Sequence, residues 1–190
     1  MDRFKESELL KLSQPQPIKS DFFVGDVKKV ARELLGTVLC VRKKSGSIFR
    51  SVINETEAYD GEKDLACHAS KGRTARTSIM YERGGVCYVY LCYGMHWMLN
   101  VVTCEEGYPA AVLIRGTEDF KGPGRLTKGL GVTGSFNGNN LHPQNSLWIE
   151  ESEGKPQQIF AGPRIGVDYA GPEWSQKPYR FWFSNCRGIV

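Results

Sequence analysis

Residues 37–59 read TVLCVRKKSGSIFRSVINETEAY, and this stretch predicts a long β-hairpin. Thr37 to Val41 is a short apolar run typical of a strand, and the turn falls in the polar sequence KKSGS at 43–47. The return strand extends from about Ile48 to Tyr59. Alternation along it places Ile53, Glu55, Glu57 and Tyr59 on one face.

A helix is expected before this hairpin and a second hairpin after it. Asp26 is a suitable N-cap, apolar residues recur with helical spacing from Val27 to Leu35, and Gly36 stands where helices commonly end. Two further apolar runs flank the sequence Tyr93-Gly94-Met95. The segments expected to complete the pattern are strands at 86–92, 96–103, 109–115, 146–150 and 179–183, a short helix at 124–130 and a loop with one helical turn at 60–85. These elements indicate an α+β fold with a mostly antiparallel sheet.

Length and charge indicate a single globular domain. The chain has 190 residues, 41% of them hydrophobic, and 25 Lys and Arg against 21 Asp and Glu leave a net charge of +4. This length suffices for one core. We expect a polar lead-in over residues 1–21, which contain Pro15 and Pro17, and one domain over 22–190.

The cysteine pattern and the apolar segments argue against secretion and membrane insertion. The six cysteines include no C-x-x-C pair, and the first residues lack the apolar core of a signal peptide. Residues 84–104 carry no charge, but Tyr, His, Asn and a central Gly94 interrupt them, which favours two strands over a membrane span. The prediction is a cytosolic protein with reduced thiols. With three histidines, no metal site is expected.

The common motifs of nucleotide-binding proteins and serine hydrolases are either absent or lack the sequence context that they need. Gly129, Gly131 and Gly134 have the spacing of a dinucleotide loop, but neither a preceding strand nor a following helix is predicted. Leu130 stands where a phosphate-binding loop would need Lys, and G-x-S-x-G does not occur.

The residues around Glu57 and the aromatic residue Tyr93 bear on the function. Glu57 lies in mid-strand on the face of Tyr59, where an unpaired buried charge would be costly. The pattern alone favours the alternative, a solvent-facing pair of carboxylates, Glu55 and Glu57, on a half-exposed strand. Tyr93 beside Gly94 places a large aromatic at the tip of a turn, which needs a partner, and a wedge between stacked bases is one use for it.

With these residues, the sequence resembles the alkyladenine (3-methyladenine) DNA glycosylase family over about residues 22 to 183. The motifs, in the family's order, are ETEAY at 55–59, CH at 67–68, GRT at 72–74, YVY at 88–90, YGMHW at 93–97, NVV at 100–102, LIR at 113–115, GPG at 122–124, PRIGV at 163–167 and KPYRF at 177–181. The resemblance implies a single mixed domain with a curved sheet flanked by helices and a projecting aromatic hairpin.

The family hydrolyses the N-glycosidic bond of damaged purines flipped out of duplex DNA. By resemblance, Glu57 is the general base, and Arg115 orients Glu57 and the attacking water. The residues matched to the base pocket are Tyr59, His68, Tyr90, Asn100 and Ile165. Asn100 disfavours the exocyclic amine of guanine, and the backbone carbonyl of Ile165 is a second candidate, after Arg115, for orienting the water. Tyr93 matches the intercalating residue.

The same resemblance implies a monofunctional enzyme without a lyase step, metal or cofactor. Its partner would be damaged double-stranded DNA, with no obligate protein partner and a monomeric state expected. The protein would act in the bacterial nucleoid, or in the nucleus of a eukaryote. Phosphate contacts are expected from the basic loop residues Lys71, Arg73, Arg76 and Arg83, and from the backbone at Gly124.

Three departures from the family pattern bear on substrate range and DNA affinity: Thr77, Met98 and a short segment after Arg115. Two alternatives remain beside the glycosylase. One is a catalytically silent nucleic-acid-binding domain, which would need neither Glu57 nor Arg115. The other is a hydrolase of free nucleosides or other sugars, for which Tyr93 at a hairpin tip would have no use.

Overall fold

The computed structural model describes residues 16–152 and 154–183. Its first hairpin joins β1 (Val38–Arg42) to β2 (Ile48–Asp60), as predicted, and the Lys43 N–H closes the turn by donating to the Ser47 carbonyl. β2 pairs with β1 through its first half and with β5 (Ala110–Thr117) and β8 (Arg180–Trp182) through its second half. The strand that carries Glu57 therefore lies at the centre of the sheet.

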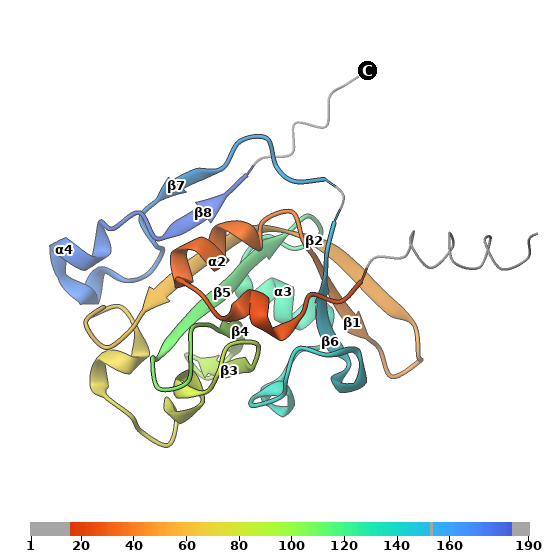
Figure 1. Cartoon of the computed structure of the whole chain (residues 1–190), viewed down its shortest axis with the longest axis horizontal. Helices are drawn as coiled ribbons and strands as arrows, with labels where there is room; N and C mark the ends of the chain where they lie inside the picture. Colours follow the sequence, from red (N-terminus) through yellow and green to blue (C-terminus); the bar gives the residue numbers. More distant parts are fainter. Residues whose placement is uncertain (1–15, 153, 184–190) are drawn as a thin grey trace, which may run out of the picture.

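The whole fold is α+β with one open antiparallel sheet, as expected. Its strands run in the order β3-β4-β5-β2-β1-β6, and β8 connects β7 to β2. In Figure 1, β7 and β8 lie with α4 at one end of the molecule and β1 and β6 at the other. The remaining strands are β3 (Cys87–Cys92), β4 (His96–Val102), β6 (Leu147–Glu150) and β7 (Phe160–Gly162). Sequence analysis missed β7, which has only three residues.

A β-bulge in β2 corrects one prediction about its faces. The register with β5 shifts between Ile53 and Thr56, where β2 changes partners. Ile53 is therefore buried in the same apolar cluster as Ala58, and not on the face of Glu57 and Tyr59. A strict two-residue period had placed Ile53 on the wrong face because a bulge adds one residue to the repeat.

Two helices cover one face of the sheet. α2 (Val27–Glu33) begins as predicted at Asp26, whose carboxylate accepts the N–H groups of Lys28 and Lys29. α3 (Pro123–Leu130) packs on β4 and β5 and contributes Leu126 and Leu130 to the same core. The third helix, α4 (Gly171–Ser175), was not predicted. The helix-covered face carries Cys87, Val89, Leu99 and Val101, so their strand neighbours point the other way.

The second hairpin turns where the sequence predicted, at Tyr93-Gly94-Met95. Tyr93 and Gly94 both have positive φ angles, 49° and 67°, and the Met95 N–H donates to the Cys92 carbonyl. The Tyr93 side chain is 88% exposed. A bulky residue in the left-handed region is uncommon and costs free energy. The strained backbone at Tyr93 thus carries an aromatic ring that is exposed to solvent.

Two predictions concern the segments outside the sheet. The loop after β2 holds two turns of 3₁₀ helix instead of one, η2 (His68–Lys71) and η3 (Ser78–Tyr81). The division into a lead-in at 1–21 and a domain at 22–190 stays a prediction, because residues 1–15 and 184–190 lie outside the described ones. The short 3₁₀ helices not yet named are η1 (Ser20–Phe23), η4 (Gly134–Phe136), η5 (Pro143–Asn145) and η6 (Asp168–Ala170).

Candidate active site

A cavity of about 850 Å³ lies on the sheet face that α2 and α3 leave open. Its wall comes from β2, β5 and the β3–β4 hairpin, with the loop at 65–77 and the loop at 165–169 on either side. The residues predicted for catalysis, base recognition and intercalation all line it: Glu57, Arg115, Tyr59, His68, Tyr90, Asn100, Ile165 and Tyr93. Residues from five separate segments therefore meet around one space.

The Glu57 carboxylate is fully buried, with 0% of the side chain exposed. One oxygen accepts the backbone N–H of Ile165 at 2.9 Å, and the other accepts the Tyr59 hydroxyl at 2.9 Å. Arg115 Nη1 lies 3.6 Å from the first oxygen. The interpretation of Glu55 and Glu57 as a solvent-facing pair is therefore wrong for Glu57.

Burial raises the pKa of Glu57 above its ordinary value, because the charged form loses its hydration. The Arg115 charge and the hydrogen bonds from Ile165 and Tyr59 oppose this shift without reversing it. The carboxylate of Glu55 adds to the upward shift by repulsion. A buried carboxylate with a raised pKa accepts protons more readily than an exposed one, which suits a general base.

Glu55 binds the arginines that surround the site. Its Oε1 accepts Arg115 Nε at 2.9 Å and Arg180 Nη1 at 3.1 Å. Arg115 comes from β5 and Arg180 from β8, the two strands that pair with this half of β2. Sequence analysis missed Arg180, although the KPYRF motif contains it. Arg115 is therefore bound to Glu55 through Nε, while its Nη1 faces Glu57.

Aromatic rings form the wall beside Glu57. The His68 and Tyr90 ring centroids lie 4.6 Å apart at 68°, and the Tyr88 and Tyr90 centroids lie 5.3 Å apart. His68 Nδ1 is 2.9 Å from the Tyr88 hydroxyl. Desolvation and the nearby Arg76 charge lower the pKa of His68 to about 4. The imidazole is thus neutral at physiological pH, which suits stacking and hydrogen bonding to a base.

Asn100 is buried in the cavity floor with a fixed orientation. Its Nδ2 donates to the carbonyl of Tyr88 at 3.0 Å and lies 3.4 Å from that of Met98. Met98 also lines the cavity, so this departure from the family pattern changes the pocket wall directly. Thr77, the other departure, accepts the Thr74 N–H and donates to the Gly72 carbonyl, and so holds the loop that carries Arg76.

The predicted phosphate-binding residues divide into two groups. Lys71 and Arg76 line the cavity, and the Arg76 guanidinium lies 5.0 Å from the Tyr90 ring centroid. Arg73 lies outside the wall, over the Tyr81 ring. Gly124 also lies outside it, and a Cβ there would sit 3.0 Å from the His96 ring, so close packing explains this glycine.

Arg83, the fourth basic residue predicted to contact phosphates, lies outside the cavity wall. It contacts Asp21 and Glu105, which belong to segments distant in the sequence.

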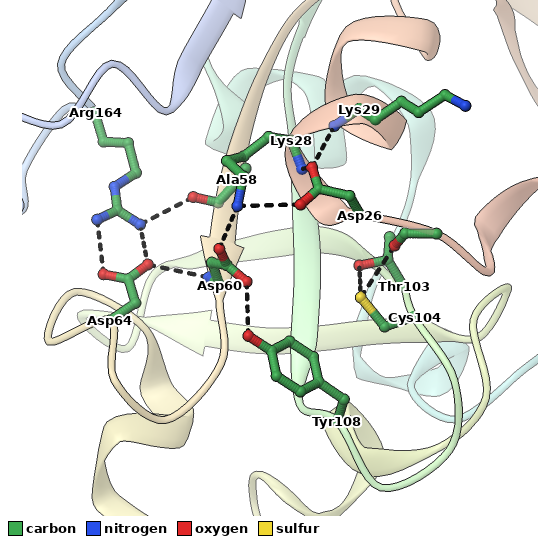
Figure 2. Close-up of polar contacts among 11 residues, drawn as sticks. Asp26, Lys28, Lys29, Ala58, Asp60, Asp64, Thr103, Cys104, Tyr108 and Arg164 are labelled. Atoms are coloured by element: carbon green, nitrogen blue, oxygen red, sulfur yellow. Dashed lines mark hydrogen bonds and ion pairs between the residues drawn. The ribbon is translucent and has the colours of Figure 1, made fainter.

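A buried ion pair lies next to the site, bonded to β2 at Ala58, and was not predicted from the sequence. Arg164 and Asp64 are both fully buried, and Arg164 Nη2 donates to Asp64 Oδ1 at 2.8 Å (Figure 2). Tyr169, also unpredicted, lines the cavity mouth and donates its hydroxyl to the Ala66 carbonyl. The PRIGV motif contains Arg164, but nothing local to it indicates a partner 100 residues away.

Neither a membrane-spanning helix nor a metal-binding cluster emerges from the described parts of the chain. No helix there is long and apolar enough to cross a bilayer, and no group of three His, Cys, Asp or Glu could hold a metal ion. The five described cysteines are free thiols, and Cys186 lies outside the described residues. The expectation that no metal or cofactor takes part stays a prediction.

Comparison with known proteins identifies the family. The model of the family described as methylpurine-DNA glycosylase matches residues 21–120 and 117–187, nearly the whole chain. The chain belongs to this family. It is thus a DNA glycosylase, a hydrolase of DNA repair, and the resemblance seen in the sequence is confirmed.

Individual relatives match over similar lengths. A protein of Myxococcus xanthus named "Putative 3-methyladenine DNA glycosylase" is 45% identical over 186 residues, covering 90% of this chain and 92% of its own. Proteins with the same name from Methanocella arvoryzae and Borrelia garinii are each 40% identical. These alignments cover 87% and 88% of this chain and 91% and 96% of the relatives.

Proposed function

We propose that this glycosylase removes alkylated or deaminated purines from duplex DNA with a water molecule activated by Glu57. The observation that carries the proposal is the buried Glu57 carboxylate, held by Ile165 and Tyr59 at the wall of an aromatic cavity. Burying a carboxylate is costly, and a binding pocket for a flat base has no need of one. A sugar carbon that develops positive charge is stabilised by a carboxylate beside it.

The reaction follows from this arrangement. The damaged purine leaves the stack and enters the cavity between Tyr59, His68 and Tyr90. As the N-glycosidic bond breaks, its electron pair leaves with the purine, and the sugar acquires oxocarbenium character that the Glu57 carboxylate stabilises. Water attacks C1′ and loses its proton to Glu57. A purine methylated at N3 or N7 is cationic and leaves as the neutral base, whereas hypoxanthine or ethenoadenine leaves as an anion and takes up a proton from solvent. The products are a free base and an abasic sugar. Arg115 keeps the carboxylate oriented from 3.6 Å.

The substrates we propose are 3-methyladenine, 7-methylguanine, hypoxanthine and ethenoadenine. The names of the relatives support the first of them. The flat aromatic walls accept any of the four purines, whereas the fixed Asn100 amide in the floor opposes a guanine amine. Tyr93, exposed at the hairpin tip, would fill the gap that the extruded nucleotide leaves.

We further propose that the enzyme has no lyase step and works as a monomer on damaged double-stranded DNA, in a nucleoid or a nucleus. A lyase needs an amine that attacks C1′. Lys71 is the single lysine lining the cavity within the described ranges, and it is exposed at the end of η2, whereas Glu57 is buried on β2. A catalytically silent binding domain is the alternative, and the cost of burying Glu57 speaks against it.

The test uses duplex oligonucleotides that contain one hypoxanthine or one ethenoadenine. Wild type and Glu57→Gln are incubated with them in EDTA, and half of each sample then receives hot alkali. We expect strand cleavage by wild type after alkali only, and a rate about 10²–10⁴-fold lower for Glu57→Gln, the usual contribution of a general base. Cleavage without alkali would contradict the absence of a lyase step.

A binding measurement completes the test. Glu57→Gln should bind a duplex with an abasic-site analogue as tightly as wild type, because the substitution keeps the shape of the side chain. If wild type releases no base from these substrates or from methylated DNA and yet binds damaged duplex, the binding domain is the correct alternative and the glycosylase proposal fails.

A further inference from the structure

The Arg164–Asp64 ion pair is the most deeply buried pair of charges in the described chain, with 0% of either side chain exposed. The contact is bidentate: Arg164 Nη1 donates to one carboxylate oxygen at 2.5 Å and Nη2 to the other at 2.8 Å. Figure 2 shows the fork facing the carboxylate, with the Ala58 carbonyl beside it. Arg164 Nη1 donates to that carbonyl at 2.9 Å.

The pair ties together three segments that build the cavity. Through Ala58, Arg164 binds β2 between Glu57 and Tyr59, and its guanidinium lies 4.8 Å from the Tyr59 ring centroid. Through its carboxylate, Asp64 accepts the backbone N–H groups of Asp60 and Ala66 in the loop that leads to His68. The residue after Arg164 is Ile165, whose N–H donates to Glu57.

Stability alone does not account for such a pair. Removing two charges from water is expensive, and apolar residues of similar volume often serve a core equally well or better. What an apolar pair cannot provide is a fixed, directional link between a strand and two loops. The Ile165 amide must lie within hydrogen-bonding distance of Glu57, and the bond from Arg164 to Ala58 holds the adjoining backbone segments together.

We propose that Arg164 and Asp64 form a positioning pair, which holds the Ile165 amide against the Glu57 carboxylate and Tyr59 against the base. The inference rests on the proposed role of Glu57 as the base that activates water. Neither Arg164 nor Asp64 touches the substrate.

The charges around Glu57 define the expected effect on pH dependence. Glu57 faces Tyr59 and Glu55 on its own strand, Arg115 on β5, and the Ile165 amide with the Arg164 charge behind it. Loss of the pair removes two opposite charges together, so their direct effects on Glu57 largely cancel. It also loosens the Ile165 hydrogen bond, which disfavours the carboxylate, so the pKa of Glu57 rises. Because the base acts deprotonated, the acid limb of the rate profile moves to higher pH.

The test variant is Arg164→Met with Asp64→Asn, which leaves no buried charge unpaired. Single-turnover base release and affinity for an abasic-analogue duplex are measured from pH 5 to 9. We expect a rate lowered about 10–100-fold, as for small displacements of reacting groups, and an acid limb raised by about one pH unit. Thermal stability and abasic-duplex affinity should stay close to wild type. Unchanged rate and pH limb in a folded variant would overturn the proposal.

A matched control and a conservative variant sharpen the result. Arg50→Met with Glu150→Gln removes another partly buried pair, at the far end of the sheet, and should leave the rate and the pH limb unchanged. If Arg164→Met/Asp64→Asn does not fold, Arg164→Lys replaces it: Lys keeps the charge and loses the fork. That variant should show a roughly tenfold rate loss and an acid limb moved to higher pH, because the fork that positions the Ile165 amide is lost, and a wild-type rate would overturn the proposal.

A measurement without turnover separates this inference from the proposed function. Carboxyl ¹³C NMR, with the Glu57 signal assigned from Glu57→Gln, gives the pKa of Glu57 in wild type and in Arg164→Met/Asp64→Asn. A higher pKa in the double variant supports positioning even if wild type proves inactive on every lesion. An equal pKa refutes it, whatever the activity of wild type.

Discussion

Replacement of Tyr93 by Ala tests whether the hairpin tip enters DNA. The ring is 88% exposed and sits on a backbone with φ of 49°, so the free protein gains little from it. On the same hairpin, Met95 is 71% exposed and Leu91 43%. An exposed apolar tip beside a cavity is typical of a surface that becomes buried in a complex. Tyr93→Ala should therefore affect binding and leave the fold intact.

The size of the effect follows from the exposed ring. A tyrosine buries roughly 150–250 Å² when fully covered. At 88% exposure, about 130–220 Å² remains for DNA to cover, which at ~25 cal/mol per Å² sets an upper limit of about 3–5.5 kcal/mol. Aromatic stacking on a base contributes about 1–3 kcal/mol when measured by alanine substitution. The expected loss of affinity is thus roughly 5- to 150-fold.

The assay is fluorescence anisotropy with a duplex that carries one abasic-site analogue, compared with the undamaged duplex. Tyr93→Ala should lose affinity for the first and little for the second. Its free energy of unfolding should change by less than about 0.5 kcal/mol, as for other exposed sites. Phe160→Ala, an aromatic on β7 away from the cavity, is the control. Equal affinities of wild type and Tyr93→Ala for the abasic duplex would refute the wedge.

Four further outcomes are expected. Arg73→Ala should reduce the slope of log affinity against log salt by about 1 if Arg73 binds a phosphate, and an unchanged slope would exclude that contact. Arg76→Ala should raise the pKa of His68 from about 4, because one positive charge beside the ring is lost; NMR titration of the imidazole measures it. Glu55→Gln should lower the pKa of Glu57 and move the acid limb of base release to lower pH, since Glu55 repels that carboxylate. Glu57→Gln should raise thermal stability above the pKa of Glu57, by about 1.4 kcal/mol per unit of its upward shift, and the gain should vanish below pH 4.

The sequence predicted local elements well, because each carries its own signal. The Asp26 cap and the apolar spacing after it located α2, and Gly94 located the turn of the second hairpin. The candidate site came from the resemblance, which brought together residues that no periodicity connects. Pattern alone left Glu57 open between a buried base and a solvent-facing carboxylate, since a strand's period does not say which face is covered.

What the sequence did not predict depends on contacts between distant segments. The bulge that turned Ile53 to the helix-covered face arises where β2 changes partners from β1 to β5. The pairing of Arg164 with Asp64 depends on how two loops approach across 100 residues. In each case the deciding interaction partner is set by the tertiary fold, and neither residue signals it locally.

The electrostatics of the site favour proton transfer over charge pairing. Arg115 forms only a long ion pair with Glu57, at 3.6 Å through Nη1, while its Nε donates to Glu55 at 2.9 Å. Arg180 is also bound by Glu55. Glu57 is therefore neutralised only in part, and burial keeps its pKa raised. A buried carboxylate with a raised pKa accepts a proton from water more readily than an exposed one, and its burial costs the fold stability.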